Sequence, residues 1–274
     1  MRYRASQGVH VFGDKIEKVW KLKKWTGWQD PDKDVLFFGM YDKNDYDVYN
    51  SFNGKKTIFW CGSDVPRMLM SQECIRVVKE DPGATHWVET IAQANELMKV
   101  GIDAHVAPSF LEDINDFPVS FKPSDKPHIY LSGHPNREGE YGFDLAKRMA
   151  IRFPQVTFHL YGVDKSDDRN DCPKNVIYHG WVQNKQFNEE IKNYQGCIRA
   201  NKHDGNSEIP MKAILMGQYP MTYLPLQPYE CAWQYRTDDE LATLIQKLID
   251  TKEPNLKARN YWRENLNQFP WVKK

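Results

Sequence analysis

The chain has 274 residues, of which 41% are hydrophobic and 13% aromatic, and its 37 basic and 37 acidic residues cancel to a net charge of zero. This length suits one large domain or two of ordinary size, and an apolar content this high excludes global disorder. The zero net charge gives no indication of a nucleic-acid or membrane partner, although it does not exclude a local basic patch.

The five cysteines are scattered and include no Cys-x-x-Cys pair. This pattern favours a reducing compartment over a disulfide framework or a zinc site. The first residues, MRYRASQGVHVFGD, lack the apolar core of a signal peptide, and no uncharged apolar run approaches the length of a membrane span. We expect a cytoplasmic protein without stable membrane insertion, and a monomer.

Short runs rich in β-branched and aromatic residues predict strands at 35–39, 57–61, 104–107, 128–132, 156–162, 176–180, 196–200 and 219–223. Helical spacing of apolar residues predicts helices at 90–101, 139–154, 209–217 and 239–250, with a last amphipathic helix at 255–271. The apolar faces of three of these helices are Ile91, Ala94, Leu97 and Met98; Phe143, Ala146, Met149 and Ala150; and Leu241, Leu244, Ile245 and Leu248. Strands that alternate with helices predict βαβ units and mainly parallel sheets, an α/β fold.

The segment VSFKPSDKPH, residues 119–128, holds two prolines and several charges without periodicity. This composition is typical of a linker, and it leaves a domain-sized segment on each side. We predict an N-terminal domain at 1–122, a C-terminal domain at 123–252, and a C-terminal helix at 253–274 that packs back on the N-terminal domain.

A glycine-rich loop follows the predicted strand at 128–132 and precedes a helix. It contains Gly133 and Arg137. In α/β sheets, loops of this kind bind ligands, because backbone N–H groups and the helix dipole favour phosphate. Arg137 would add a charge-assisted clamp. Taken alone, these residues favour a plain solvated loop, because glycine-rich loops are common.

The run VIYHGWV, residues 176–182, is a short strand followed by a glycine and an aromatic residue. Gly180 would let the backbone approach a planar base, and Trp181 would stack on that base. The alternative is a core tryptophan beside a turn.

The stretch RANKHDGNSEIPMK, residues 199–212, concentrates hydrogen-bonding side chains just ahead of a helix. Pro210 suits the first turn of that helix. In a parallel sheet, the N-terminus of this helix and the loop at 133–139 face the same edge. The convergence of two features that favour phosphate indicates a binding site rather than a solvated loop.

The order of HIYLSG, REG, FHLYG, VIYHGWV, HDG and PMKAILMGQYP resembles the C-terminal nucleotide-sugar-binding domain of retaining GT-B glycosyltransferases, family 4-like. IFWCGSDVPRM and HWVETIAQANELMKVGIDAHVAPSF resemble segments of the N-terminal, acceptor-side domain of that family. The resemblance runs over about 57–250. It implies a GT-B fold, in which two Rossmann-like domains face each other across a cleft.

The resemblance implies an enzyme, a hexosyl- or pentosyltransferase that moves a sugar from a nucleotide-diphosphate sugar, expected to be a UDP-sugar, to a hydroxyl acceptor with retention. No metal or further cofactor is required, because cations and a helix N-terminus would stabilise the leaving diphosphate. The implied catalytic residues are Asp64, Arg199 and Asp204. The implied donor-binding residues are Gly133, Arg137, Gly162, Gly180, Trp181, Lys202, His203, Gly205, Asn206, Ser207, Glu208 and Lys212. Gly62 and Ser63 would lie on the acceptor side.

Two of these residues carry alternatives. Lys212 stands where the family has a glutamate that holds the ribose of the nucleotide, and an ammonium group cannot accept those hydrogen bonds. Either Glu208 substitutes, the ribose is held differently, or activity is lost. Asp64 equally suits the N-cap of a helix with Pro66 in its first turn.

Two features of the sequence raise the question of a metal site, and neither supports one. Asp45-Tyr46-Asp47 matches the Asp-x-Asp metal motif of the other glycosyltransferase fold. It follows no convincing strand end, and a chain this rich in Asp and Tyr produces such triplets by chance. The eight histidines show no His-x-x-x-His spacing, which argues against a zinc site.

The sequence is compatible with several classes of acceptor. DKIEKVWKLKKW, residues 14–25, has five lysines against two acids, with Trp20 and Trp25. It is either a solvated amphipathic helix or a patch for a polyanion, DNA included. One hypothesis is a hydroxymethylated base in DNA, as in phage genome glycosylation in the host cytoplasm. Another is a glycan or lipid-linked saccharide. A non-catalytic protein that only binds nucleotide-sugar is the third, and Lys212 is its best support.

Overall fold

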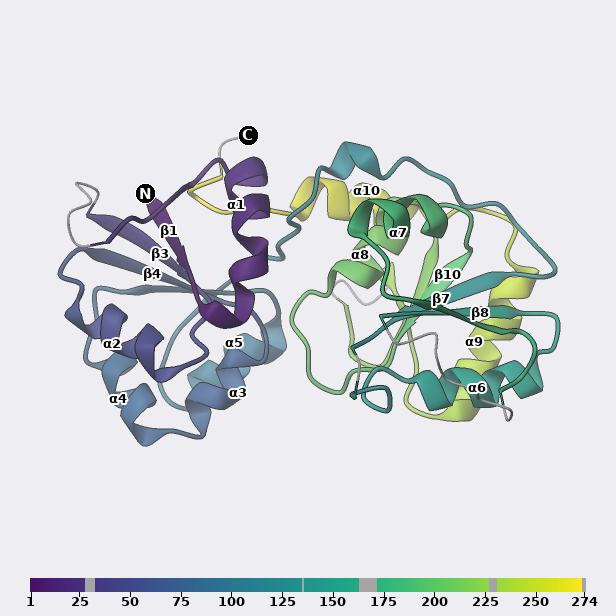
Figure 1. The fold of residues 1–274 in the computed structure, drawn as a ribbon, viewed down its shortest axis with the longest axis horizontal. Coiled ribbons are helices and arrows are strands. Elements are labelled where there is room, and N and C mark those ends of the chain that lie inside the picture. Colours follow the sequence, from purple (N-terminus) through teal and green to yellow (C-terminus); the bar gives the residue numbers. More distant parts are fainter. Residues whose placement is uncertain (28–32, 135, 163–171, 227–230, 273–274) are drawn as a thin grey trace. The chain divides into compact units, whose positions relative to one another are not determined.

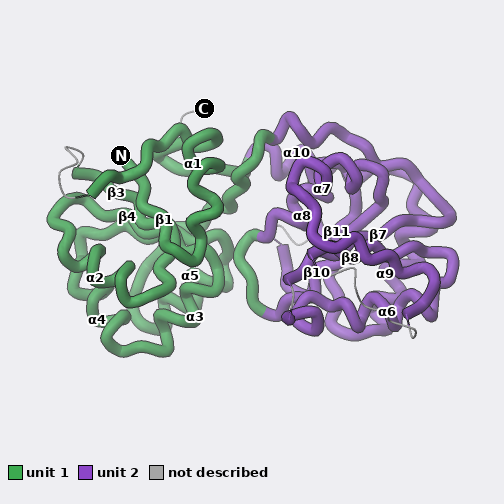
Figure 2. The backbone as a smooth tube through the Cα atoms, in the orientation of Figure 1, with its two compact units in different colours: residues 1–113, 203–206, 265–274 green, residues 114–202, 207–264 purple. Residues whose placement is uncertain are grey.

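The computed structural model describes residues 1–27, 33–134, 136–162, 172–226 and 231–272. The chain divides into two compact units (Figure 2). Unit 1 contains residues 1–113, 203–206 and 265–274, and unit 2 contains residues 114–202 and 207–264. The last two residues of unit 1, and of the predicted helix at 253–274, lie outside the described residues.

Unit 1 is built on a six-stranded parallel sheet in the order β2-β1-β3-β4-β5-β6. Figure 1 labels β1, β3 and β4 of this sheet. The strands are β1 (Arg2–Ala5), β2 (Lys23–Lys24), β3 (Asp34–Phe38), β4 (Lys55–Trp60), β5 (Thr85–Val88) and β6 (His105–Val106). The helices are α1 (Gly13–Val19), α2 (Lys43–Ser51), α3 (Asp64–Leu69), α4 (Gln72–Lys79) and α5 (Ile91–Met98), with a short 3-10 helix, η1 (Gln7–Phe12).

Both faces of this sheet are covered, because successive side chains of a strand point to opposite faces. Val35 and Phe37 of β3 pack in a core with residues of α2, α3, α4 and α5. Leu36 and Phe38 pack on the other face, in a core that α1 and the C-terminal residues complete. Strands buried on both faces explain the continuous apolar runs in the sequence.

Unit 2 repeats this plan with a six-stranded parallel sheet in the order β12-β11-β10-β7-β8-β9. The strands are β7 (His128–Ser132), β8 (Thr157–Tyr161), β9 (Val176–Gly180), β10 (Gly196–Arg199), β11 (Tyr219–Thr222) and β12 (Trp233–Gln234). The helices are α6 (Phe143–Arg152), α7 (Asn184–Ile191), α8 (Glu208–Leu215), α9 (Asp238–Asp250) and α10 (Leu256–Asn265), and η2 (Ile114–Asp116) is a short 3-10 helix. Helices α6 and α9 cover one face.

The structure confirms the eight predicted strands and the parallel sheets, and it has a helix at each predicted position, but the last one ends at Asn265 and not at residue 271. The faces predicted for α6 and α9 are the buried ones. On α5, only part of the predicted face is buried: Leu97 lies in the core, but Ile91 and Met98 are 42% and 54% exposed. Strands β1, β2, β5 and β12 were not predicted, because each is at most four residues long and carries polar side chains.

The lysine-rich segment at 14–25 is not the continuous, aromatic-flanked helix that its sequence suggests. Helix α1 ends at Val19, and Lys23 and Lys24 form the edge strand β2. Trp20 is 1% exposed, and its ring packs against Phe38 and Phe59. Both tryptophans therefore belong to unit 1 cores, since Trp25 packs against the core on the other face.

The C-terminal residues contribute to both units. Helix α10 belongs to unit 2, where Arg259 Nε donates to the carbonyl of Leu215 at 2.6 Å. Phe269 and Trp271, further along, lie in the core of unit 1 with Trp20. Within the part of the chain that the structure describes, no helix is long and apolar enough to cross a membrane.

A row of three histidines crosses the α7 side of the unit 2 sheet. His128 Nδ1 lies 2.8 Å from His159 Nε2, and His159 Nδ1 lies 2.8 Å from His179 Nε2. The His159 ring also stacks on Tyr194 at 4.2 Å between centroids. Burial, with the neighbouring histidines as a second cause, lowers the pKa of His159 to about 3.

This row predicts acid sensitivity. A histidine whose pKa is depressed in the folded state contributes its full stability above its ordinary pKa of about 6.5 and loses it as pH falls toward 3, at about 1.4 kcal/mol for each pH unit. We expect the thermal midpoint to fall between pH 7 and pH 5, and to fall less steeply in His159→Phe. His10→Gln, which changes an exposed residue of η1, is the control. Parallel melting curves for wild type and His159→Phe would contradict this prediction.

Candidate functional site

The carboxyl ends of β7, β8 and β9 are lined by three predicted donor-binding glycines. Gly162 N donates to the carbonyl of Gly180 at 2.9 Å, and Gly133 N donates to the carbonyl of Tyr161 at 3.0 Å. A Cβ on Gly162 would lie 2.4 Å from the oxygen of Gly133, and both Gly162 and Gly180 have positive φ. The sequence requires glycine here because backbone packs directly on backbone. The result is a strand edge without side chains at these positions.

Trp181 follows this edge directly. Its side chain is 78% exposed, so it is not the core tryptophan of the alternative interpretation. An indole that stays in water beside a bare strand end offers a flat apolar face to a planar ligand.

Arg137 and Arg199 share one tyrosine. The guanidinium carbons lie 5.8 Å and 5.0 Å from the centroid of the Tyr141 ring. Arg137, in the predicted loop, also forms an ion pair with Glu140. Arg199 is the last residue of β10, so strand end and loop bring Arg137, a predicted donor-binding residue, and Arg199, a predicted catalytic residue, to one aromatic ring.

Helix α8 begins as its sequence predicts. Ser207 is the N-cap, and its hydroxyl accepts from Ile209 N at 3.4 Å. Pro210 lies in the first turn, where its missing N–H costs no hydrogen bond. Glu208 opens the helix beside the positive end of the helix dipole.

Lys212 is buried inside unit 2. It is 2% exposed, and its ammonium donates to Asn184 Oδ1 at 3.0 Å and Asn188 Oδ1 at 2.9 Å, both on α7. Glu208 Oε2 lies 4.0 Å away, one helical turn earlier. The lysine therefore bonds to α7, and the amide oxygens of Asn184 and Asn188 and the Glu208 carboxylate lie close to its charge.

Residues 203–206 belong to unit 1, although the residues before and after them in the sequence belong to unit 2. They pack on the strand ends of unit 1. Asn206 N donates to Glu89 Oε2 at 2.9 Å, and Asn206 Nδ2 donates to the carbonyl of Ser109 at 2.9 Å. Ser109 in turn donates to Glu89 Oε1 at 2.5 Å. His203 pairs with Glu96 of α5 at 3.1 Å. The sequence-predicted donor residues at 203–206 are thus divided from Lys202 and Ser207, which belong to unit 2.

Gly205 and Gly62 meet in the same place. A Cβ on Gly205 would lie 2.1 Å from Glu89 Oε2, and a Cβ on Gly62 would lie 3.0 Å from Gly205 N. Both glycines are therefore required by close approach, and Gly62 additionally has a φ of +115°. The predicted acceptor-side and donor-side glycines lie against each other within unit 1.

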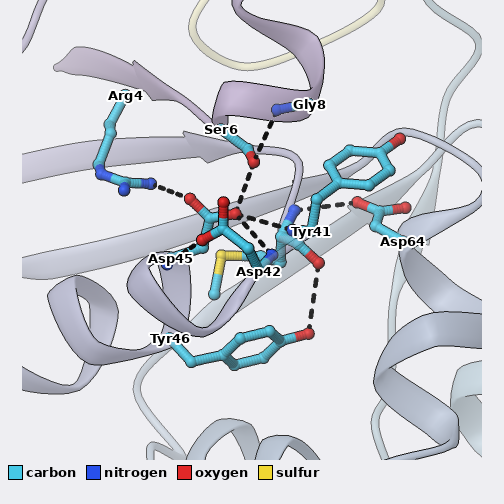
Figure 3. A network of polar contacts seen from close by, with 9 residues as sticks. Arg4, Ser6, Gly8, Tyr41, Asp42, Asp45, Tyr46 and Asp64 are labelled. Atoms are coloured by element: carbon cyan, nitrogen blue, oxygen red, sulfur yellow. Dashed lines mark hydrogen bonds and ion pairs between the residues drawn. The ribbon is translucent and has the colours of Figure 1, made fainter.

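Asp64 is fully buried at the start of α3 (Figure 3). Its Oδ2 accepts from Met40 N at 3.2 Å and Cys61 N at 3.0 Å, and its Oδ1 accepts from Val65 N at 3.0 Å. The carboxylate therefore joins the ends of β3 and β4. Burial raises the pKa of Asp64 to about 6. Ser63, and not Asp64, is the N-cap of α3, so Asp64 is the first residue of the helix and its buried carboxylate accepts hydrogen bonds from backbone N–H groups.

Glu89, after β5, is a carboxyl group that sequence reasoning did not select. Removal from water raises the pKa of Glu89 to about 8, and the charges of Asp204 and Asp64 act in the same direction against the hydrogen bonds from Ser109 and Asn206. A carboxyl group that titrates near neutral pH is suited to proton exchange or to a pH-dependent contact. Only a strand end followed by a capping threonine, Thr90, marked this position in the sequence.

Glu89 predicts an alkaline limit to stability. Its folded-state pKa is raised, so its contribution is complete below an ordinary pKa of 4.5 and is lost as pH rises through about 8. Glu89→Gln cannot lose a proton. We therefore expect the thermal midpoint of the variant, relative to that of the wild type, to rise steadily from pH 5 to pH 8. Glu80→Gln, an exposed residue of the same unit, should show no such trend. A constant difference between wild type and Glu89→Gln would refute the assignment.

The Asp-x-Asp triplet lies within α2, and Asp45 has an internal role (Figure 3). Its carboxylate accepts from Arg4 Nη1 at 2.6 Å, from Ser6 Oγ at 2.5 Å and from Tyr41 N at 2.8 Å. With Asp42 it also forms a reciprocal capping box. Among the described residues, no group of three or more His, Cys, Asp or Glu side chains is placed to hold a metal ion.

No protein-family model matches the chain, and no curated protein matches its sequence. Solved structures match its fold at low sequence identity. S. aureus TarM, solved with UDP, α-GlcNAc-glycerol and fondaparinux, superposes with a TM-score of 0.65 and 13% identity over 93% of this chain and 55% of its own. The lipopolysaccharide outer core galactosyltransferase WaaB gives 0.61 and 15%, over 96% and 76%. Anabaena HepE, solved with UDP and glucose, gives 0.60 and 14%, over 85% and 74%.

This chain has two six-stranded parallel sheets, each covered by helices, and it superposes on these structures over most of its length. The chain has the GT-B fold. It spans about half the length of TarM. The fold predicted from the motifs is confirmed. A shared fold does not by itself establish a shared activity.

Proposed function

We propose that this GT-B chain is a glycosyltransferase that moves a sugar from a nucleoside-diphosphate sugar to a hydroxyl acceptor. The observation that carries the proposal is the glycine-lined end of β7, β8 and β9, next to the exposed Trp181. UDP in the TarM and HepE structures supports a UDP-sugar as the donor. The base would lie on the strand ends near Gly180 and stack on Trp181.

In this proposal the diphosphate lies near Arg137, Arg199 and the N-terminus of α8. Positive charge at these positions would stabilise the charge that develops on the leaving group, and no metal is required. Asp204 would orient the donor sugar. Gly62 and Ser63 would line the acceptor side, with Asp64 as the residue that holds their loop in place.

Glu208 is the proposed substitute for the ribose-binding glutamate. Lys212 donates to α7 and offers no acceptor. Glu208 is one turn closer to the start of α8, and its side chain is 24% exposed. A carboxylate there would accept hydrogen bonds from ribose hydroxyls while Lys212 balances its charge.

Release of free nucleoside diphosphate from a panel of UDP-, GDP-, ADP- and dTDP-sugars tests the proposal. We expect turnover with one donor class, with water or an added hydroxyl as acceptor. Thermal stabilisation by a nucleotide without turnover of any donor would instead favour a non-catalytic nucleotide-sugar-binding protein. Neither turnover nor stabilisation would contradict both.

We propose retention of anomeric configuration because of the resemblance to retaining GT-B glycosyltransferases.

We also propose a polyanionic acceptor, with hydroxymethylated DNA as the first candidate and a glycan or lipid-linked saccharide as the second. The supporting observation is the exposure of Lys18, Lys21, Lys23 and Lys24 on unit 1. Exposed lysines that neutralise phosphates make binding salt-dependent. Salt-sensitive retention on DNA that is lost in a Lys18→Gln, Lys21→Gln, Lys24→Gln triple variant supports the acceptor. Unchanged retention excludes this patch as its binding surface.

A further inference from the structure

A second tyrosine-centred pair of cations lies at the carboxyl edge of the unit 2 sheet. Tyr223 directly follows β11, and the Lys202 ammonium and the Arg236 guanidinium carbon lie 5.9 Å and 4.7 Å from its ring centroid. Lys202 comes from the segment after β10, and Arg236 from the residue before the N-cap of α9. Three segments distant in sequence thus place two positive charges on one ring.

The position of Arg236 is set by the backbone as well as by the ring. One of its terminal nitrogens donates to the carbonyl of Tyr223, and its own N–H donates to Glu240 Oε2 at 2.5 Å. Tyr223 N in turn donates to the carbonyl of Arg199 at 2.9 Å. A guanidinium group has five N–H donors, so most of them stay available to a planar or tetrahedral anion.

The acidic residues that follow Arg236 in the sequence are already engaged. Asp238 pairs with Arg148 at 2.7 Å, and Asp239 pairs with Arg152 at 2.8 Å. Glu240 accepts from the backbone at the start of α9. Within the described residues, neither Lys202 nor Arg236 has a carboxylate within ion-pair distance. An anion bound beside the Tyr223 ring would add a favourable charge interaction with each of these cations.

The charge and geometry select the ligand class. A compact ammonium and a planar guanidinium fork together match the oxygens of a phosphate group. Both side chains are exposed, which suits a phosphate that arrives from solvent on a larger molecule. Arg137 and Arg199 surround a different ring, Tyr141. The two cation pairs therefore centre on different rings of one sheet edge.

We propose that Lys202, Arg236 and Tyr223 form a phosphate-binding subsite separate from the one at Arg137 and Arg199. This deepens the proposed function, on which it rests for the identity of the substrate. The phosphate belongs either to the nucleotide donor or to a phosphodiester acceptor such as DNA. Tyr223 orients both cations, and Lys202 belongs to this subsite and not to the one at Arg137 and Arg199.

Binding measurements on the full chain separate these sources. The variants are Lys202→Gln, Arg236→Gln and the double variant, and the control is Arg152→Gln, which removes an exposed charge of the same unit. UDP is titrated by calorimetry, and a fluorescent oligonucleotide is followed by anisotropy at several salt concentrations. We expect the double variant to weaken one of these ligands at least about 10-fold, and for the oligonucleotide to reduce the salt slope by about 2.

The outcomes are unambiguous. A loss confined to UDP assigns the subsite to the donor, and a loss confined to the oligonucleotide assigns it to the acceptor. Unchanged affinity for both, or no binding of either by wild type, overturns the proposal. Because binding is measured without turnover, failure here is distinguishable from failure of the glycosyltransferase assignment, which the donor panel decides. Melting curves of all variants exclude a folding defect as the cause.

Discussion

Arg199→Ala is expected to lower the turnover of the nucleotide-sugar donor by about 10²- to 10³-fold, the loss typical when one group that stabilises transition-state charge is removed. Arg199 ends β10, and its guanidinium carbon lies 5.0 Å from the centroid of the Tyr141 ring. If it neutralises the diphosphate as that group leaves, the loss appears in kcat more than in donor KM. The measurement is the rate of nucleoside diphosphate release.

Two variants sharpen this test. Arg199→Lys keeps the charge but loses the planar fork, so an intermediate rate is expected. Arg148→Gln removes an exposed arginine of the same unit that pairs with Asp238, and it controls for the change in net charge. Wild-type rates in Arg199→Ala would remove this residue from the site.

Lys212→Ala is expected to cost about 2 to 5 kcal/mol of unfolding free energy, the range for truncating a long buried side chain. Lys212 is 2% exposed, and its stem fills space between α8 and α7. The variant also leaves the two α7 asparagine oxygens without their donor, at about 1 to 3 kcal/mol for each group that stays unsatisfied. Chemical denaturation of the full chain measures the loss.

Lys212→Met separates the two contributions. Methionine keeps most of the volume of the stem but cannot donate to Asn184 and Asn188. We expect it to be more stable than Lys212→Ala and less stable than wild type. Equal stability of Lys212→Ala and wild type would show that the ammonium and its stem are not part of the core.

The helices and longer strands can be predicted from local sequence patterns, because the spacing of apolar residues in each pattern shows which side chains are buried. The face Phe143, Ala146, Met149 and Ala150 is predicted from helical spacing alone, and it is the face that packs on the unit 2 sheet. Helix α5 departs from its pattern. Gln93 is buried because its side chain caps the helix start, while Met98 is left exposed. Capping geometry overrides apolar spacing where a helix is only about two turns long.

The short strands could not be predicted in the same way. β2 is two lysines, and it is a strand because β1 pairs with it, with Tyr3 opposite Lys24. Pairing of this kind depends on a partner distant in sequence, so no local periodicity reports it. The same holds for Trp20: its lysine-rich surroundings suggest a surface residue, but the C-terminal Phe269 and Trp271 cover it.

By itself, the sequence determined the α/β class, the order of strands and helices, and the loops that carry glycine and charge at the strand ends, because these depend on side-chain period and backbone preference. The tertiary structure alone decided which polar groups meet. Glu89 gained its raised pKa from residues at 109 and 203–206, and Lys212 found its acceptors on α7. Desolvation and hydrogen bonding depend on neighbours far away in the chain, and folding is what brings them together.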